Sequence, residues 1–303
     1  MDRKQFARFI KLLKEANERG EDVDAIMKAY EHENAYIYND GVFKKIFASE
    51  ENIALTTDLV NASLDLFGCD CISHARIVNP FVPGETGNSS VEPDIMLVND
   101  RGVGQPRDRI SIDVQHNNNT LYPARLVLYV SRITSNMVKR GAPPLLENLN
   151  VVSFQFFEAF PKSKNYRHVV QLSNQEGMLY FDLQTMTIVE VKKFLEHADA
   201  YADDNSRLAQ WLRAIDTLNR EAGFSEFSQD PVFRVLQNAV KMCNFSARYL
   251  MTVDMSDVDR AMEKYEAALE KSKEIAKGLL RDGVPLDVIV RNTNLPEKVI
   301  LSL

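Results

Sequence analysis

Residues 91–115, VEPDIMLVNDRGVGQPRDRISIDVQ, contain two apolar runs that each hold a carboxylate. Asp94 lies in the first run and Asp113 in the second, and a segment rich in glycine, proline and charge separates them. A buried carboxylate without a partner costs several kcal/mol, so such residues usually bind a metal, pair with a cation or line a cleft. The two runs are therefore expected to be strands that carry a functional site.

The separating segment predicts a hairpin between these strands. A chain that folds back at the middle of that segment places Asp94 opposite Asp113. Side chains alternate along a strand, so Asp113 and Gln115 share one face. A register slip of one residue would turn one carboxylate to the other face. The spacing thus predicts two carboxylates and an amide oxygen close together, which suits magnesium or manganese better than zinc.

Residues 93–94 (PD) and 113–115 (DVQ) together resemble the signature of the PD-(D/E)XK nuclease superfamily, with Gln115 where the signature has lysine. Two further segments are similar to one branch of that superfamily, the recombination-promoting nucleases and transposases. Residues 39–47 (NDGVFKKIF) resemble its D-x-x-F-K-x-x-F opening, and residues 122–129 (YPARLVLY) resemble its helix with arginine and tyrosine.

The resemblance extends over residues 38–214 and implies an α/β (α+β) fold with a restriction-endonuclease-like core. Such a core has the order αβββαβ and a mixed central sheet flanked by helices, and the predicted elements follow that order. They are helices at 40–66 and 121–139 and strands at 72–78, 91–98, 109–115 and 150–160, followed by a strand at 167–172 and a hairpin or two short strands at 178–191.

Helical patterns on both sides of this core predict N-terminal and C-terminal helical extensions. The predicted divisions are an N-terminal helical extension at 1–37, a nuclease-like domain at 38–195, a helical subdomain at 196–250, and a long charged helix with a helix-turn-helix-like tail at 251–303. The long helix carries a narrow apolar seam that includes Leu269, Ile275 and Leu279. Such a seam invites a partner helix, so we expect a homodimer through the C-terminal helix. For the tail, a helical cap or a dimer clasp is the alternative to contact with DNA.

The resemblance implies that Asp94 and Asp113 hold Mg²⁺ or Mn²⁺, with the backbone carbonyl of Val114 as a further oxygen ligand. The metal would lower the pKa of a bound water for attack on a phosphodiester. Gln115 would orient that water but carries no charge, so a cation must come from another residue. The branch usually has glutamate in place of Asp113, and aspartate is shorter by about 1.5 Å. Asp40 is a further catalytic candidate by analogy, or else the N-cap of its helix.

Net charge limits where nucleic acid can bind. The formal charge is −7, which argues against a broad positive surface, so any contact with DNA must be local. Lys44, Arg125 and Arg132 are the candidates for this contact, and Lys44 or Arg125 is also a candidate for the missing cation. Ordinary solvated surface charge is the alternative for these residues.

Composition indicates a globular protein, because 303 residues with 45% hydrophobic content suffice for a well-buried core. The three cysteines are odd in number and lack the spacing of a zinc or redox motif, so a disulfide framework is not expected. No apolar stretch approaches the length of a membrane span, and the first residues lack a signal-peptide pattern. We therefore expect a cytoplasmic location without membrane contact.

These observations predict a Mg²⁺-dependent endodeoxyribonuclease, a hydrolase that acts on phosphodiester bonds in DNA. Two alternatives stay open. One is a nuclease fold with weak or lost activity that binds nucleic acid or protein, in which case the acidic pair should bind no divalent metal. The other is a helical scaffold that dimerises through its C-terminal helix, and this alternative can coexist with either of the others.

Overall fold

The computed structural model describes residues 1–83, 91–102, 105–116, 118, 120–138, 141, 143–220, 224–252 and 257–303, with the backbone alone for residues 257–266. The chain forms two compact units. The first comprises Met1–Asn118 and Arg125–Val253, and the second comprises Asn119–Ala124 and Asp254–Leu303. Each unit has its own hydrophobic core.

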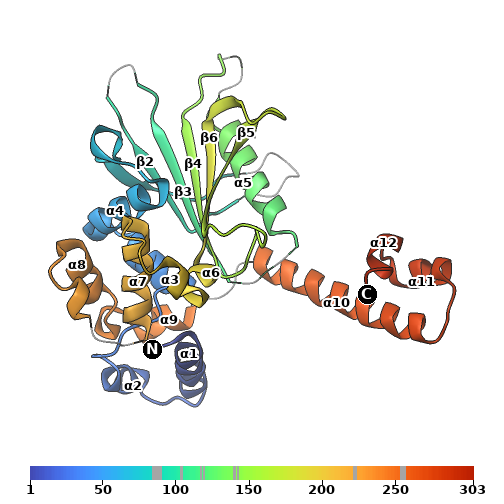
Figure 1. Ribbon diagram of the computed structural model, residues 1–303. Helices are drawn as coiled ribbons and strands as arrows, with labels where there is room; N and C mark the ends of the chain where they lie inside the picture. Colours follow the sequence, from blue (N-terminus) through green and yellow to red (C-terminus); the bar gives the residue numbers. More distant parts are fainter. Residues whose placement is uncertain are drawn as a thin grey trace. The chain divides into compact units, whose positions relative to one another are not determined.

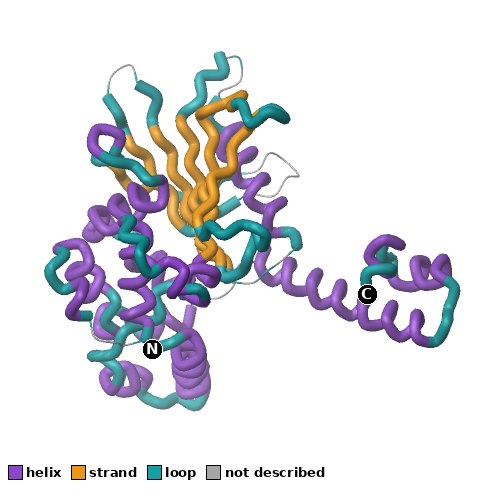
Figure 2. The backbone as a smooth tube through the Cα atoms, viewed as in Figure 1, coloured by secondary structure: helices purple, strands orange, loops and turns teal. Residues whose placement is uncertain are grey.

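A six-stranded mixed sheet forms the centre of the first unit (Figure 1 and Figure 2). The strands, in the spatial order β1-β2-β3-β4-β6-β5, are β1 (Ala75–Val78), β2 (Ile95–Asn99), β3 (Asp108–Gln115), β4 (Asn148–Gln155), β6 (Leu179–Glu190) and β5 (Arg167–Ser173). β2 is antiparallel to both β1 and β3, β4 is parallel to both β3 and β6, and β5 is antiparallel to β6. Helix α5 (Tyr122–Ser135) lies between β3 and β4 in the chain, because two parallel strands need a long crossover connection.

The predicted αβββαβ order and mixed sheet are confirmed, with one strand prediction wrong. β6 is a single strand of 12 residues, where the sequence predicted a hairpin or two short strands. Its first part pairs with β5, and its last part pairs with both β5 and β4. The register between β5 and β6 shifts after Gln171. Such an irregularity interrupts the alternation of apolar and polar residues from which strands are predicted.

The helix predicted over 40–66 is divided in the structure. It consists of α3 (Asp40–Phe47), a 3-10 turn (Glu50–Asn52) and α4 (Ile53–Leu64). The side-chain amide of Asn52 donates to the Ile46 carbonyl at 3.0 Å. The Thr56 hydroxyl donates to the Phe47 carbonyl at 2.6 Å. These bonds satisfy carbonyls at the end of α3 that would otherwise need another helical turn, so the chain can change direction there.

The two faces of the sheet have different neighbours. Ile112 and Val114 point to one face and belong to the large apolar core, which α4 and α7 complete. Asp113 points to the other face because side chains alternate along β3. α5 lies on that second face, where Thr134 accepts a hydrogen bond from Gln184 of β6 at 2.7 Å. The sheet therefore has an apolar face and a face that carries the acidic pair.

Helices that precede the strands in the chain and helices that follow them pack together in the first unit. They are α1 (Arg3–Glu18), α2 (Val23–Ala29), α6 (Val191–Glu196), α7 (Arg207–Asn219), α8 (Pro231–Ala239) and α9 (Ala247–Thr252). Asp2, Ser206 and Asp230 cap the starts of α1, α7 and α8 with their side chains. No helix in the described part of the chain combines the length and the apolar composition that a membrane span requires. The four predicted divisions of the chain stay a prediction.

The second unit is a helical tail. Its helices are α10 (Asp257–Arg281), α11 (Leu286–Thr293) and α12 (Glu297–Ile300), and its buried core consists of Ala276, Ile289, Leu295 and Ile300. Leu269 and Leu279 of the predicted seam pack against this core, whereas Ile275 is exposed. Gly283, with a φ of 71°, permits the turn between α10 and α11. The chain's own tail thus covers part of the seam, and the homodimer through the C-terminal helix stays a prediction.

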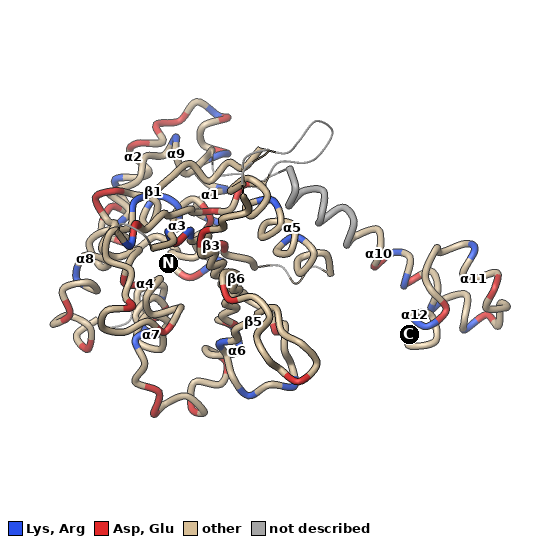
Figure 3. The backbone as a smooth tube through the Cα atoms, turned by 90° about the horizontal axis from the view of Figure 1, so that it is seen from above, with Lys and Arg blue, Asp and Glu red and all other residues tan. Residues whose placement is uncertain are grey.

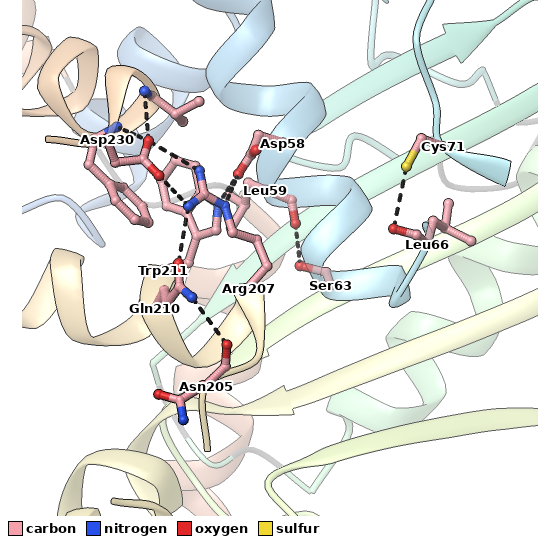
Figure 4. A network of polar contacts seen from close by, with 12 residues as sticks. Asp58, Leu59, Ser63, Leu66, Cys71, Asn205, Arg207, Gln210, Trp211 and Asp230 are labelled. Atoms are coloured by element: carbon pink, nitrogen blue, oxygen red, sulfur yellow. Dashed lines mark hydrogen bonds and ion pairs between the residues drawn. The ribbon is translucent and has the colours of Figure 1, made fainter. Parts of the chain in front are cut away.

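An ion-pair network joins α4, α7 and α8 (Figure 4). Arg207 Nε donates to Asp58 Oδ1 at 2.8 Å, and its Nη1 donates to Asp230 Oδ2 at 2.6 Å. Trp211 Nε1 donates to the same Asp58 oxygen at 2.5 Å, and the guanidinium lies 4.4 Å from the centre of the Phe233 ring. The three charged side chains are each less than one-third exposed, so water screens them only in part. The network therefore fastens α7 and α8 to the core helix α4.

We expect Arg207→Met to lower the free energy of unfolding by about 1–3 kcal/mol, because two partly buried carboxylates lose their cation. Urea denaturation followed by the fluorescence of Trp211, the single tryptophan, measures this change. Arg220→Met is the matched control, since Arg220 pairs with one carboxylate, Asp216, and its own side chain is 63% exposed. That variant should differ from wild type by less than about 0.5 kcal/mol. Equal losses in the two variants would contradict the role of the network.

Candidate active site

The acidic pair consists of Asp94 and Asp113. Ile95 pairs with Ile112 in the antiparallel ladder, so Asp94, one residue before β2, lies opposite Asp113. This register is the one that the spacing predicts. The tip of the hairpin, residues 103–104, lies outside the described residues.

A backbone donor and a cation hold Asp94. Its Oδ2 accepts a hydrogen bond from the Val114 N–H at 2.8 Å, and its Oδ1 lies 3.1 Å from Lys44 Nζ. Phe43 and Phe47 of α3 are buried in the core, and this anchors the helix that carries Lys44. The Lys44 side chain is 40% exposed, so its ammonium lies at the edge of the site, within reach of solvent.

Neighbouring carboxylates stabilise the charged form of Lys44. Burial lowers the pKa of the ammonium, but the Asp94 carboxylate, with Asp40 and Glu92, outweighs burial and raises the pKa above its ordinary value. Lys44 is therefore a cation at neutral pH, beside a carboxylate.

Asp113 is more deeply buried, with a side chain that is 1% exposed. Arg125 Nη2 lies 3.7 Å from Asp113 Oδ1, and Arg125 Nε donates to the Tyr129 hydroxyl at 2.8 Å. Burial, and then the charge of Asp113, raises the pKa of Tyr129 well above its ordinary value. Tyr129 therefore stays a neutral hydroxyl that orients Arg125 one helical turn away.

Asp40 is the first residue of α3 and not its N-cap. The cap is Asn39, which has an extended backbone and accepts a hydrogen bond from the Val42 N–H at 3.3 Å. The N-cap alternative for Asp40 is therefore wrong, because the helix starts one residue earlier than that alternative requires. The half-buried carboxylate contributes to the raised pKa of Lys44. Its catalytic role stays a prediction.

Val114 and Gln115 end β3 and point to opposite faces. The Val114 side chain belongs to the apolar core, and its N–H is bonded to Asp94, so its carbonyl is the one group that it could offer to a metal. Gln115 follows Asp113 on the acidic face and is 9% exposed. These positions agree with the predicted roles, and the roles themselves stay predictions.

Arg132, the third candidate for DNA contact, is separate from the acidic pair. It lies about two turns beyond Arg125 on α5, roughly 10 Å along the helix axis. The residue is half-buried, and its Nε has no hydrogen-bond partner in the described part of the chain. The structure thus brings Lys44 and Arg125 to the pair and leaves Arg132 further along α5.

Sequence reasoning missed a further buried carboxylate, Glu190, at the end of β6. Its side chain is fully buried and contacts Lys193, His168 at 3.2 Å, and the Phe160 N–H at 2.7 Å. Burial raises the pKa of Glu190, but the bonds from these partners outweigh burial, and the pKa is lowered. A signal was present in residues 186–191 (MTIVEV), where a carboxylate again interrupts an apolar run.

Lys193 also fastens the segment that follows β4. Its ammonium donates to the backbone carbonyls of Phe160, Ser163 and Asn165 at 2.9, 3.2 and 3.4 Å. The side chain is 4% exposed. Glu190 and Lys193 therefore form a structural centre beside the strand ends.

A row of polar side chains crosses the ends of three parallel strands. Gln115 of β3 pairs in register with Gln155 of β4, and Gln155 pairs with Glu190 of β6. All three side chains are buried on the acidic face. Ligands of open α/β sheets commonly bind at the carboxyl ends of parallel strands, so the row lies where a bound group is expected.

The oxygen atoms of the acidic site fit a hydrated divalent cation. Among the described residues, no group of three or more His, Cys, Asp or Glu side chains is placed to hold a metal ion. The acidic pair nevertheless offers two carboxylates, and Mg²⁺ is usually bound through one or two carboxylates with water as the remaining ligands. The buried amide oxygen of Gln155 has no hydrogen-bond partner in the described structure and adds an acceptor. The available atoms are thus oxygens, which suit a hard cation.

A family model described as PD-(D/E)XK nuclease family transposase matches residues 37–268. No curated protein and no solved structure matches the chain. The matched segment contains the whole sheet, the acidic pair and both of its cationic partners. It spans well over half of the sequence, so the resemblance found in the motifs is confirmed, and the chain belongs to the PD-(D/E)XK nuclease family transposases.

Proposed function

We propose that the chain is a metal-dependent nuclease that hydrolyses phosphodiester bonds in DNA, with Mg²⁺ or Mn²⁺ as its cofactor. Family membership supports a nuclease or transposase-like function. The observation that carries the proposal is the position of Asp94 beside Asp113 on one sheet face, with Lys44 and Arg125 next to them. Oxygen ligands and cations close together are what phosphodiester hydrolysis requires.

In this proposal, the carboxylates of Asp94 and Asp113 and the carbonyl of Val114 would hold the cation. A bound divalent ion lowers the pKa of water and stabilises negative charge on the phosphate. The Val114 N–H fixes the orientation of the Asp94 carboxylate. Gln115 lies next to Asp113 on the same face and orients the attacking water through its amide. Asp40 acts through its charge on Lys44.

Lys44 supplies the cation that Gln115 cannot supply. Its ammonium is 3.1 Å from Asp94 and is partly exposed, so it can contact a substrate phosphate at the edge of the site. Arg125 is only 10% exposed, so its main contribution is to neutralise Asp113. Arg132 would contact DNA further from the scissile bond.

Binding to DNA must rely on this local set of cations. Figure 3 shows acidic and basic residues interspersed along the described chain, and the formal charge of the whole chain is −7. A protein of this charge gains little from non-specific attraction to the DNA backbone. A bound metal ion, together with Lys44, would therefore supply much of the positive charge next to the substrate.

Replacing either carboxylate by its amide tests the site. We expect Asp94→Asn and Asp113→Asn each to reduce cleavage of linear and supercoiled DNA in Mg²⁺ or Mn²⁺ by at least about 100-fold, because each variant loses a charged ligand. Asp182→Asn is the matched control, since Asp182 is an exposed carboxylate of β6, and it should cleave like wild type. Equal cleavage by all four proteins would point to another site or a contaminant. An inactive wild type that takes up no metal in calorimetry would favour the non-catalytic alternative.

Lys44→Met separates the role of the ammonium from metal binding. We expect cleavage to fall roughly 10- to 100-fold, because charge on the phosphate loses a stabilising cation. The affinity for Mn²⁺ should stay equal or rise, because no positive charge then competes for Asp94. Lys45→Met is the control, since Lys45 is exposed and lies 5.9 Å from the centre of the Tyr249 ring. Cleavage by Lys44→Met at the wild-type rate would exclude this role.

The homodimer through the C-terminal helix also stays a prediction. Among the seam residues whose side chains the structure describes, Ile275 is the exposed one, at 45%, and the tail core does not use it. We expect light scattering to give a mass that rises with concentration for wild type, and a monomer mass for Ile275→Lys, because a charge on the seam opposes helix pairing. A monomer at every wild-type concentration would exclude the dimer.

A further inference from the structure

Gln155 is a buried polar residue next to the acidic pair. It ends β4, and its side chain is 1% exposed. Its Nε2 donates to the Ser153 hydroxyl at 3.1 Å, whereas its Oε1 has no hydrogen-bond partner among the described residues. A buried amide oxygen without a partner is costly, so such an atom commonly has a water or a ligand beside it.

The direction of the side chain brings this amide toward Asp113. Ser153 pairs in register with Asp113 on the neighbouring strand, and both point to the acidic face. Neighbouring strands lie about 4.8 Å apart. The bond to Ser153 turns the Gln155 side chain back along β4, from the level of Gln115 to the level of Asp113. The amide therefore belongs to the acidic site, although it comes from a third strand.

The chemistry of the atoms limits what can bind there. Asp94, Asp113 and the Gln155 oxygen are all acceptors, so a phosphate oxygen would be repelled by them. A partner with O–H donors or a positive charge fits, and a hydrated divalent cation has both properties. If the amide were rotated by 180°, the oxygen would accept from Ser153 and the unpartnered atom would be a donor. Variants at this position distinguish the two orientations.

We propose that Gln155 is a positioning residue of the metal site, whose amide oxygen accepts a hydrogen bond from the hydration shell of the cation held by Asp94 and Asp113. The inference rests on the proposed function and extends the site from β2 and β3 to β4. Acceptors around a metal's bound ligands typically change its affinity 10- to 100-fold. Gln155 thus contributes to holding the metal without contacting it.

The test measures Mn²⁺ binding to the full chain without DNA, by electron paramagnetic resonance of the free ion. We expect Gln155→Met, which keeps the length of the side chain and removes the acceptor, to weaken binding about tenfold. Gln155→Glu keeps an acceptor oxygen and should bind Mn²⁺ at least as tightly as wild type. Thr187→Val is the matched control, because the Thr187 hydroxyl is equally buried and also lacks a partner in the described structure, but points to the opposite face. This control should bind like wild type.

Several results would overturn the inference. Unchanged Mn²⁺ affinity in Gln155→Met, or equal weakening in Thr187→Val, would show that Gln155 has no specific role. Circular dichroism shows whether Gln155→Met folds. If it does not fold, Gln155→Glu tests the inference instead. Weaker Mn²⁺ binding by Gln155→Glu than by wild type would then reject the role of an acceptor oxygen at this position. Metal binding by wild type that is insensitive to residue 155 would leave the proposed function intact. A wild-type chain without Mn²⁺ binding would overturn both together.

Discussion

Two carboxylates that face one another inside a sheet repel each other, and the repulsion is strong where water is excluded unless positive groups lie close. In this chain, Lys44 and a backbone N–H neutralise Asp94, and Arg125 neutralises Asp113. These cations come from α3 and α5, so both helices must hold fixed positions against the β2–β3 hairpin. The crossover between the parallel strands β3 and β4 meets this requirement, because it carries α5 over the acidic face. The charges of the acidic pair therefore constrain where α3 and α5 lie relative to the β2–β3 hairpin.

The glutamine at position 115 changes which element supplies the positive charge. A lysine at that position would extend from β3, on the same face as Asp113, whereas Lys44 reaches the site from the side, on the short helix α3. In this site, the strands supply the oxygen atoms and the helices supply the cations. A strand residue is fixed by its ladder, but a helix residue depends on how the helix packs. Phe43 and Phe47 hold α3 in the core and so help to fix the Lys44 ammonium.

The hairpin register could be predicted because alternation and the two apolar runs encode it locally. The break between α3 and α4 could not, since it depends on where the Asn52 and Thr56 side chains reach once the chain has turned. Gln155 had a local signal, because polar residues 153 and 155 alternate with Val152 and Phe154, but its burial depends on what packs above the sheet. Two partners of Glu190, His168 and the Phe160 N–H, come from distant segments that meet it only in the folded sheet. Positions within one hairpin were therefore accessible to sequence reasoning, and contacts between elements far apart in the sequence were not.

The bonds of Lys193 have a consequence for the motion of the segment between β4 and β5. That segment has no regular secondary structure over residues 157–166, and such loops usually open on their own. Here three of its carbonyls are bonded to one buried ammonium, which is itself paired with the fully buried Glu190. Opening the loop would take three carbonyl acceptors from the buried ammonium and the Phe160 N–H from the buried carboxylate. Its backbone amides should therefore exchange with solvent deuterium about as slowly as those of β6, and a protease should find the loop accessible only when the sheet itself unfolds.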